Sequence, residues 1–319
     1  MPQKLHYVTL DVFAIEPFKG NPLAVVFLPQ DNTSSITQDK KQLIAREFNF
    51  SETIFVHPHD ISTPSSRRID IFTTLREIPF AGHPTIGASS WFQRHSQDPH
   101  DQGVRTIVTK SGDIPITKSD DGVSVVAQIA HNVRIHAARF PLSELLRLHS
   151  SLEPFLKQKR DGFPVVSIVN GMSQIHVELP SLEALAAVQP SAGGEMIRGD
   201  SGYLDDGWRE GLIVVYFFVR NVLDAATGKT VIRTRMFLGS LEDPATGSAA
   251  SGLAAYLSLT DPEVIKNGGG DFDIVQGVEM GRRSDIGVGV ALTGDGKAIR
   301  SVELKGAAVK VAEGDIMVV

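Results

Sequence analysis

A long internal repeat constrains the fold of this chain more than any other feature. When the 319-residue sequence is shifted by 165 positions, so that Glu77 falls on Glu242, six identical residues coincide within about twenty positions and without a gap. About one coincidence is expected by chance at ordinary residue frequencies. The period is too long for a solenoid. We therefore expect two similar halves, with the active site between the two copies. The coinciding pairs are Arg68/Arg233, Phe72/Phe237, Glu77/Glu242, Pro79/Pro244, Gly82/Gly247 and Gly87/Gly252.

Each copy of the repeat predicts a strand, a Pro-containing turn, a Gly and then a helix that begins at His83 or Ser248. Gly82 and Gly247 permit backbone conformations that a Cβ would forbid, and they let a ligand approach the main chain closely. The helix begins with unpaired N–H groups and the positive end of its dipole. Pro84 suits the first turn, and Ser248 is a good N-cap type. Capped helices are often only structural, but two such ends facing one cleft would hold a carboxylate-bearing substrate.

The remaining pattern is that of a mixed α+β chain with more strand than helix and no regular βαβ alternation. The Gly- and Ser-rich segment Pro190–Trp208 is expected to be a long mobile loop, and the Gly and Asp residues of Ser111–Asp121 suggest a domain boundary. Expected strands are Tyr7–Phe13, Leu23–Phe27, Thr53–Val56, Arg68–Phe72, Val104–Val108, Val123–Ile129, Val165–Val169, Ile175–Glu178, Leu212–Arg220 and Val231–Phe237. Expected helices are Gln38–Phe48, Pro84–His95, Leu142–Leu148, Leu182–Ala187 and Ala249–Leu259.

Composition excludes several classes of function. A hydrophobic content of 42% and a charged content of 21% are typical of a soluble globular protein, and the length suits two domains. The net charge of −6 offers no basic surface for nucleic acid or anionic lipid. The longest apolar stretch, Leu212–Val219, is too short to cross a bilayer, and Met1–Leu10 does not suit a signal peptide, so a cytoplasmic location is expected. The chain has no cysteine, which excludes disulfides and thiol nucleophiles.

Six motifs together resemble the phenazine-biosynthesis PhzF-like family, and they extend from the first expected strand to about Arg283. The resemblance implies the diaminopimelate epimerase-like fold, in which two similar domains each wrap a mixed sheet around a central helix. It implies a first domain of residues 1–115 completed by a C-terminal strand at about 305–319, a second domain of residues 118–304, and a homodimer. The motifs are Asp11-Val-Phe-Ala, Gly20-Asn21-Pro22, Ala45-Arg-Glu-Phe-Asn-Phe-Ser51-Glu52-Thr53, Pro79-Phe-Ala-Gly-His83-Pro84, Glu242-Asp243-Pro-Ala-Thr-Gly-Ser248-Ala and Gln276-Gly277-Val-Glu279.

The chain departs from diaminopimelate epimerases at the residue before the Gly of each repeat. Those enzymes carry a Cys there, and this chain has Ala81 and Thr246. Both thiol bases are therefore missing, and the two-base epimerase reaction of those enzymes is excluded.

Glu52 is the best candidate for the base that replaces them. It begins an expected strand between apolar Phe50 and Ile54, and such surroundings should raise the pKa of its carboxyl group toward neutrality. From the sequence alone, a surface Glu at a helix-to-strand junction is the favoured interpretation, and the resemblance reverses this. The resemblance places the family's catalytic glutamate on Glu52.

Four further side chains are candidates for substrate binding or proton relay. His83 could be a helix-capping or core histidine, and the resemblance aligns it with an active-site histidine. Asp243 precedes a Pro and could be an Asx-turn residue, whereas the resemblance makes it a substrate-contacting acid with Ser248 beside it. Asn21 could be a turn residue before Pro22 or could line the cleft, and Gly82 and Gly247 would supply backbone donors.

The sequence therefore predicts a cofactor-independent isomerase of a small carboxylated substrate, similar to trans-2,3-dihydro-3-hydroxyanthranilate isomerase. Glu52 would move a proton between carbons. His57-Pro58-His59 lacks further ligands at metal spacing, and no phosphate loop or complete dinucleotide fingerprint occurs, so no metal or other cofactor is expected. Two alternatives stay open: a racemase that uses Glu52 and Asp243, and a non-catalytic binding or regulatory protein that keeps the fold.

Overall fold

The protein consists of two compact units built to one plan. The computed structural model describes residues 3–30, 36–156 and 161–318. The first unit comprises Met1–Ile129 together with Glu303–Val319, and the second comprises Ala130–Val302. The division after Ile129 lies later than the boundary expected near residue 115, because Ser111–Asp121 contains a strand that pairs with strands on both sides of it.

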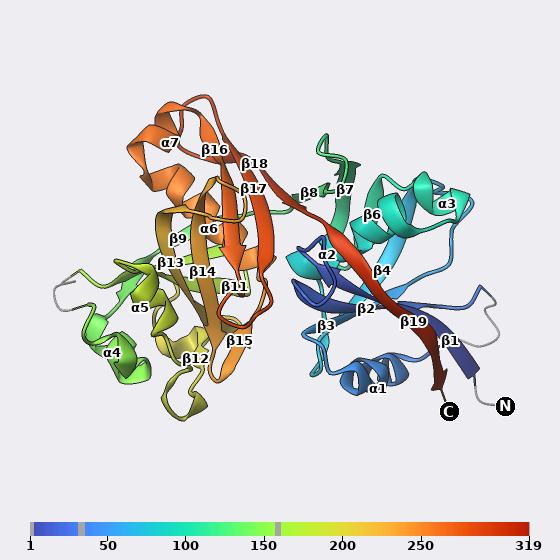
Figure 1. Cartoon of the computed structure of the whole chain (residues 1–319), viewed down its shortest axis with the longest axis horizontal. Coiled ribbons are helices and arrows are strands. Elements are labelled where there is room, and N and C mark those ends of the chain that lie inside the picture. Colours follow the sequence, from blue (N-terminus) through green and yellow to red (C-terminus); the bar gives the residue numbers. More distant parts are fainter. Residues whose placement is uncertain (1–2, 31–35, 157–160, 319) are drawn as a thin grey trace. The chain divides into compact units, whose positions relative to one another are not determined.

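The first unit is a mixed sheet in the order β19–β1–β2–β3–β4–β6–β7–β8 (Figure 1). Only β2–β3 and β4–β6 pair in parallel, and the short β5 adds to the end of β4. The last strand of the chain pairs with the first, as the resemblance implies. The strands are β1 (Gln3–Val12), β2 (Asn21–Phe27), β3 (Glu52–Val56), β4 (Ser66–Phe72), β5 (Glu77–Ile78), β6 (Thr106–Thr109), β7 (Gly112–Lys118), β8 (Val125–Ile129) and β19 (Ala308–Val318).

The second unit repeats this order as β9–β10–β11–β13–β14–β16–β17. Again only the third and fifth pairings, β11–β13 and β14–β16, are parallel, and the short β15 adds to the end of β14. The repeat therefore extends from the sequence to the topology. The strands are β9 (Arg134–Phe140), β10 (Phe163–Val169), β11 (Met172–Glu178), β12 (Ile197–Arg198), β13 (Leu212–Leu223), β14 (Thr230–Leu238), β15 (Leu241–Asp243), β16 (Gly269–Gln276), β17 (Ser284–Leu292) and β18 (Ile299–Gly306).

In each unit, one central helix packs against the sheet. All nine residues of α2 (Gly82–Ser90) are buried, and the helix contacts β1, β2, β3, β6, β8 and β19. The corresponding α6 (Gly247–Thr260) contacts β10, β11, β16 and β17. A Cβ on Gly87 would lie 2.2 Å from Leu23 Cδ2, and a Cβ on Gly252 would lie 2.0 Å from Gln174 Oε1. The repeated glycine therefore lets each helix approach its sheet, which confirms the expected fold of a mixed sheet around a central helix.

The remaining helices lie outside the sheets. The helix α1 begins and ends where the sequence pattern predicts, and α4 does so too. The apolar faces of α4 and α5 join a large core of the second unit, which includes Leu145, Leu185 and Phe217. These helices are α1 (Gln38–Phe48), α3 (Pro99–Gln102), α4 (Leu142–Leu148), α5 (Leu182–Ala186) and α7 (Pro262–Lys266), and a π-helical turn at Trp91–His95 continues α2.

Pro190–Trp208 is not the structureless loop that its composition predicts. It contains two short 3₁₀ helices, Ala192–Gly194 and Gly199–Ser201, and strand β12, which pairs with β13. The buried Ile197 and Leu204 join the core of the second unit, and these apolar residues amid Gly and Ser hold the segment in place.

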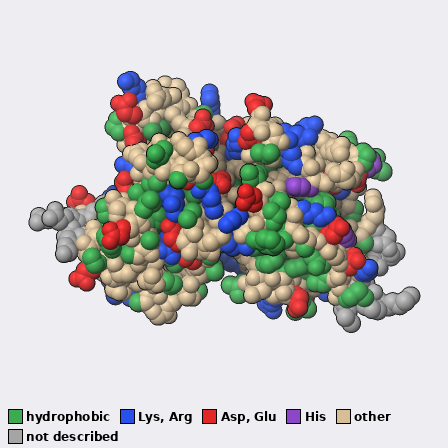
Figure 2. Space-filling model, viewed as in Figure 1, with side chains coloured by type: hydrophobic (Ala, Val, Ile, Leu, Met, Phe, Trp, Pro, Cys, Tyr) green, Lys and Arg blue, Asp and Glu red, His purple; other side chains and the backbone are tan. Residues whose placement is uncertain are grey.

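The surface is mixed in charge. Figure 2 shows Lys and Arg side chains interspersed with Asp and Glu side chains on the face that it draws. Within the described residues, no helix combines the length and apolar character needed to cross a membrane.

Candidate active site

Glu52 and His83 form a hydrogen-bonded pair in the first unit. Glu52 is the first residue of β3, and His83 is the second residue of α2. His83 Nδ1 lies 2.8 Å from Glu52 Oε2, and His83 Nε2 lies 3.1 Å from the carbonyl oxygen of Asn21. The His83 side chain is 4% exposed and that of Glu52 is 18% exposed, so the carboxylate is the more accessible member of the pair.

The contacts of His83 fix where its protons lie. A carbonyl oxygen only accepts hydrogen bonds, so the nitrogen facing Asn21 carries a hydrogen. The bond between Nδ1 and the Glu52 carboxyl group then needs one further proton, located on either the ring or the carboxyl group. The pair is therefore built to hold one transferable proton.

The pKa of Glu52 is lowered, so the expected raised pKa is wrong. Burial raises the pKa of this carboxyl group, but the hydrogen bond from His83, the charge of His83 and a hydrogen bond from Ser51 together outweigh burial. The sequence places His83 31 residues from Glu52, and only the packing of α2 on β3 brings the two together. Glu52 is thus ionised at neutral pH and ready to accept a proton.

The loop before β2 positions Asn21. Gly20 has a φ of +65°, and a Cβ there would lie 2.2 Å from the carbonyl oxygen of Val12, so the turn requires glycine. Ser51 Oγ donates to Asn21 Oδ1 at 3.2 Å. The Ser51 hydroxyl thus lies within reach of two acceptors, Asn21 Oδ1 and the Glu52 carboxylate, and its single hydrogen serves one of them at a time.

The end of α1 determines where β3 begins. The side chain of Thr37 caps the first turn of α1 by accepting a hydrogen bond from the Lys40 amide. Asn49 then ends the helix in the left-handed conformation, with a φ of 53°. Because the helix ends sharply at Asn49, β3 can begin at Glu52, three residues later.

The first turn of α2 offers free amide groups beside this pair. Its N-cap, Ala81, has an extended backbone and makes no side-chain capping bond. The amides of Gly82 and His83 have no partner within the helix, and Pro84 has no N–H group. The helix starts at Gly82 rather than at the expected His83, and Gly82 is not among the positive-φ glycines.

In the second unit, Asp243 is held by a side-chain network. The hydroxyl group of Thr246 donates to Asp243 Oδ2. Gln276 Nε2 donates to the carbonyl oxygen of Asp243 at 2.7 Å and to Thr246 Oγ1 at 3.0 Å, while Gln276 Oε1 accepts from the Thr246 amide at 3.3 Å. Gln276 was not among the predicted site residues, although it lies in the Gln276-Gly277 motif.

Ser248 is not the N-cap of α6. The N-cap is Thr246, whose hydroxyl group turns to Asp243 and makes no capping bond, and the helix starts at Gly247. Ser248 is therefore the second helical residue, equivalent in the repeat to His83, and its side chain is half-buried. Gly247, like Gly82, has no positive φ.

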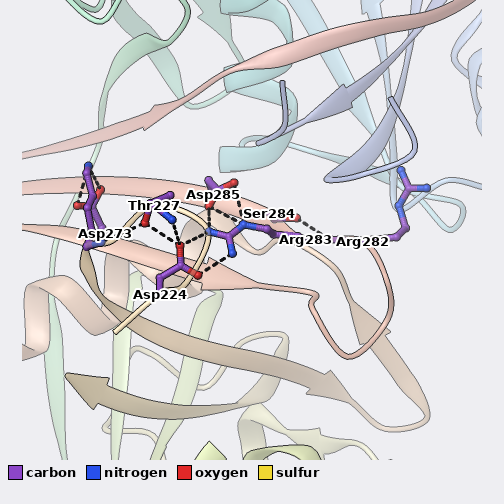
Figure 3. A network of polar contacts seen from close by, with 8 residues as sticks. Asp224, Thr227, Asp273, Arg282, Arg283, Ser284 and Asp285 are labelled. Atoms are coloured by element: carbon purple, nitrogen blue, oxygen red, sulfur yellow. Dashed lines mark hydrogen bonds and ion pairs between the residues drawn. The ribbon is translucent and has the colours of Figure 1, made fainter. Parts of the chain in front are cut away.

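The turn after Gln276 is anchored by ion pairs (Figure 3). Arg283 donates to both carboxylate oxygens of Asp224 at 2.8 and 2.9 Å and also pairs with Asp285 at 2.7 Å. Gly277 has a φ of +73°, and a Cβ there would lie 2.6 Å from the carbonyl oxygen of Pro244. The turn is thus packed directly against the segment that carries Asp243.

The structure therefore collects the predicted residues into two sets. Asn21, Glu52, Gly82 and His83 gather at the start of α2, and Asp243, Gly247 and Ser248 gather at the start of α6. Within the described residues, no group of three or more His, Asp or Glu side chains is arranged to hold a metal ion.

Comparisons with known proteins find relatives along nearly the whole chain. The family described as "Phenazine biosynthesis-like protein" (PhzC-PhzF) matches residues 10–314. A trans-2,3-dihydro-3-hydroxyanthranilate isomerase of Pseudomonas aeruginosa is 31% identical over 97% of this chain and 98% of its own length. One of Pseudomonas chlororaphis is 33% identical over 88% of each chain. Among solved structures, a PhzF-family protein of Bacillus anthracis superimposes with a TM-score of 0.72 at 21% identity and covers 99% of this chain and 100% of its own, which shows the shared fold.

Proposed function

This chain belongs to the phenazine biosynthesis-like (PhzC-PhzF) family, and on that premise we propose that it is an isomerase in which Glu52 moves a proton between two carbons of a small carboxylated substrate. The observation that carries the proposal is the hydrogen-bonded chain from Glu52 through His83 to the Asn21 carbonyl group. This arrangement supplies an ionised carboxylate that is 18% exposed. The neighbouring His83 ring can hydrogen-bond to the Glu52 carboxyl group whether that group is ionised or protonated.

The reaction requires only one base. Glu52 takes a proton from a carbon next to a double bond, the electrons of the C–H bond shift the double bond by one position, and the same carboxyl group returns the proton to a more distant carbon. No electron or atom is gained or lost overall. The amides of Gly82 and His83, at the positive end of α2, would stabilise the negative charge that develops on the substrate.

The second unit has no carboxylate at the position equivalent to Glu52, which favours a one-base reaction over a symmetric two-base racemase. The register of strand pairing identifies the equivalent residues: Thr53 faces Phe72 in the first unit, and Val215 faces Phe237 in the second. The position of Glu52, one residue before Thr53, is therefore occupied by Val214 in the second copy. Because Ala81 and Thr246 also stand where two thiols would be needed, a symmetric pair of bases is missing from the described part of the chain.

The second set of residues is assigned to substrate binding. We assign Asp243 to a polar group of the substrate, and Ser248 with the Gly247 amide to its carboxylate or to developing charge. The substrate named for the relatives, trans-2,3-dihydro-3-hydroxyanthranilate, has the required carboxylate and is the first candidate. The expected position of the site between the two copies stays a prediction.

The test uses candidate acids in deuterium oxide. Wild type is expected to place deuterium at the displaced carbon of the product, and Glu52→Gln is expected to slow this by about 10³-fold, as loss of a general base typically does. Glu47→Gln, which changes an exposed carboxylate on α1, is the matched control and should retain full activity.

Each other outcome has a defined meaning. Deuterium at the original carbon with inversion would instead support a racemase. Equal exchange by Glu52→Gln and wild type, or no exchange of any candidate acid by wild type, would contradict the proposed role of Glu52.

The homodimer and the cytoplasmic location also remain part of the proposal. Analytical ultracentrifugation at micromolar concentration should give twice the chain mass of 34.5 kDa. A mass of a single chain would contradict the homodimer.

A further inference from the structure

The interior of the second unit is polar at positions where the interior of the first unit is apolar. The repeat aligns Ile69 with Thr234, and the strand register that places Glu52 with Val214 also places Ile54 with Tyr216. On the adjacent strands, Leu23 faces Glu52 and Gln174 faces Val214, so Leu23 is equivalent to Gln174 and Val25 to His176. The contacts of Gly87 with Leu23 and of Gly252 with Gln174 support this alignment independently.

Burial is the same in both copies, so exposure does not explain the difference. In the first unit, Leu23, Val25, Ile54 and Ile69 are at most 1% exposed, and so are their equivalents in the second unit, Gln174, His176, Tyr216 and Thr234. Burying hydroxyl, amide and imidazole groups is unfavourable unless hydrogen bonds compensate, and the first unit forms the same topology with Leu, Val and Ile at these places. The fold therefore does not require the polar residues of the second unit, and their cost indicates a function.

Two of these side chains form a hydrogen-bonded chain that ends at Asp243. Tyr216 Oη lies 3.1 Å from Thr234 Oγ1 and 3.1 Å from Gln276 Oε1. Because an amide oxygen only accepts, Tyr216 donates to Gln276, and Thr234 donates to Tyr216. The amide of Gln276 is thereby oriented, with its oxygen toward Tyr216 and its nitrogen toward Asp243 and Thr246.

This orientation determines the hydrogen bond at the Asp243 carboxylate. Since Gln276 Nε2 donates to Thr246 Oγ1, the hydroxyl hydrogen of Thr246 is left to donate to Asp243 Oδ2. The Thr246 amide, at the N-cap of α6, is held by Gln276 Oε1. A single buried side chain, Gln276, thus holds both Asp243 and the first turn of the helix.

Tyr216 always donates a hydrogen bond in this series of linked side chains. Burial raises the pKa of its hydroxyl group strongly, the hydrogen bond from Thr234 offsets only part of that rise, and the negative charge of Asp243 adds to it. The hydroxyl group keeps its proton throughout the pH range in which enzymes work.

We propose that Tyr216 and Gln276 are positioning residues of the reaction, which direct the Asp243 carboxylate and the start of α6 toward the substrate. This inference rests on the proposed function of Asp243 and Ser248. The first unit needs no such chain, because the carbonyl group of Asn21 orients His83 directly.

A parallel branch reaches the carbonyl group of Ser248. His176 Nε2 lies 3.3 Å from Gln174 Oε1, and Gln174 Nε2 donates to the Ser248 carbonyl oxygen at 3.4 Å. Burial lowers the pKa of His176 to about 3, so its ring is neutral and serves as a fixed donor rather than a charge. The longer distances of this branch make it the weaker support of the two.

The first test is kinetic and uses Tyr216→Phe with Tyr203→Phe as the matched control. Tyr203 lies in the same unit and packs on Phe140, outside the chain of hydrogen bonds. In the deuterium oxide assay with trans-2,3-dihydro-3-hydroxyanthranilate, Tyr216→Phe should lower kcat about 10-fold, the effect of one lost hydrogen bond on the transition state, and leave KM within about 2-fold. A Tyr216→Phe enzyme with wild-type kcat would overturn the proposal.

The second test separates positioning from a merely structural role. Gln276→Glu keeps the shape but replaces the donating NH₂ group by a carboxylate that repels Asp243. Its activity should fall at neutral pH and recover in part as the pH is lowered and the new carboxyl group takes up a proton, whereas wild type should show no such recovery. Parallel pH profiles of the two enzymes would contradict the proposal.

The third test does not need a substrate. In Gln276→Met, hydrogen exchange of the Thr246 amide should accelerate by about 10-fold or more because its acceptor is lost, while exchange of the Gly82 amide should stay within about 2-fold. Unchanged exchange at Thr246 would overturn the positioning role. If the Thr246 amide exchanges faster in Gln276→Met but wild type converts none of the candidate acids, the role of Gln276 in holding α6 stands and the proposed reaction is refuted.

Discussion

The starts of α2 and α6 occupy the same place in two copies of one fold, but they are organised differently. At α2, a buried His and a partly exposed Glu share a proton, and a backbone carbonyl group orients the ring. At α6, Asp243 is held by Thr246 and Gln276, and the amide of Gln276 is in turn oriented by Tyr216 from within the core.

The difference shows that a duplicated fold need not keep duplicated chemistry. The topology, the central helix and the repeated glycines are alike in both units, because they determine packing. The side chains at the two helix starts differ. On the proposed function, the first copy moves a proton and the second holds charge and polar groups.

In each unit, a glycine in the left-handed backbone conformation, Gly20 or Gly277, forms a turn next to the candidate site residues. Replacing these glycines should have the largest effect on stability. A Cβ on Gly20 or Gly277 would meet a backbone carbonyl oxygen, at 2.2 Å from Val12 and at 2.5 Å from Arg282. Each Ala substitution should lower the free energy of unfolding by about 2–4 kcal/mol, measured by urea denaturation. Gly122→Ala has a positive φ but open space, and it should cost only about 1 kcal/mol. Equal losses in all three variants would show that the close contacts do not matter.

Replacing Asp243 by Asn should weaken catalysis by about 100-fold, next in size. The substitution keeps the shape and leaves the backbone bond from Gln276, but it removes the charge that Thr246 and the substrate are proposed to meet. Asp205→Asn, at an ion pair with an exposed Arg134 in the same unit, serves as the control. If kcat/KM of Asp243→Asn equals that of wild type, the second unit does not take part in the reaction as proposed.

Removing the imidazole of His83 should move the acid limb of the pH–rate profile. In wild type the pKa of Glu52 is depressed, so its base form persists as the pH falls and is lost only when the pH passes below that depressed value. In His83→Gln burial remains but the compensating charge is gone, so the pKa rises and activity falls at a higher pH, with an expected loss of about 30-fold at neutrality. An acid limb that does not move would contradict the proton-sharing pair.

The same pair predicts a pH dependence of stability. Because the folded pKa of Glu52 lies below its unfolded value, its contribution to stability is present above the unfolded pKa and disappears as the pH falls through the folded pKa. His95→Gln, which removes a ring that hydrogen-bonds to the Ala308 carbonyl group, should leave this dependence unchanged and is the control for His83→Gln.

The smallest expected effect is at Ser248. Its hydroxyl group is half-buried, and α6 is already held by Gln276 through Thr246, so Ser248→Ala should lower kcat/KM by only about 3- to 10-fold. The change should appear in KM more than in kcat if the hydroxyl group binds the ground state. A loss as large as that of Asp243→Asn would require a more direct catalytic role for Ser248.

Much of the fold could be predicted from the sequence because local patterns and the repeat agree. The ten expected strands and five expected helices all occur, with small shifts at their ends. The expected strands did not include the longer strands β7, β9 and β16–β18 or the short strands β5, β12 and β15. Arg134–Phe140 has polar residues at three of seven positions and its alternation is broken by two adjacent alanines, and Gly269–Gln276 begins with Gly-Gly-Asp, so neither shows a strong apolar alternation.

The candidate site could be predicted only at the level of residue identity. Glu52 and His83 were both expected, but the lowered pKa of Glu52 depends on their contact, which tertiary packing alone creates. Tyr216 read as one more apolar strand residue in Leu212–Arg220. The strand registers align Tyr216 with Ile54 of the other copy, and this difference is what supports its proposed positioning role.

The central claim is that one carboxylate on one copy performs both proton transfers, and the stereochemistry of deuterium incorporation tests this most directly. The candidate acid is converted by wild type in deuterium oxide, and the face of the product that carries the label is determined by NMR. A single base at Glu52 predicts that deuterium enters from the same face from which the proton was removed. Deuterium on the opposite face would require a second base and would contradict the account.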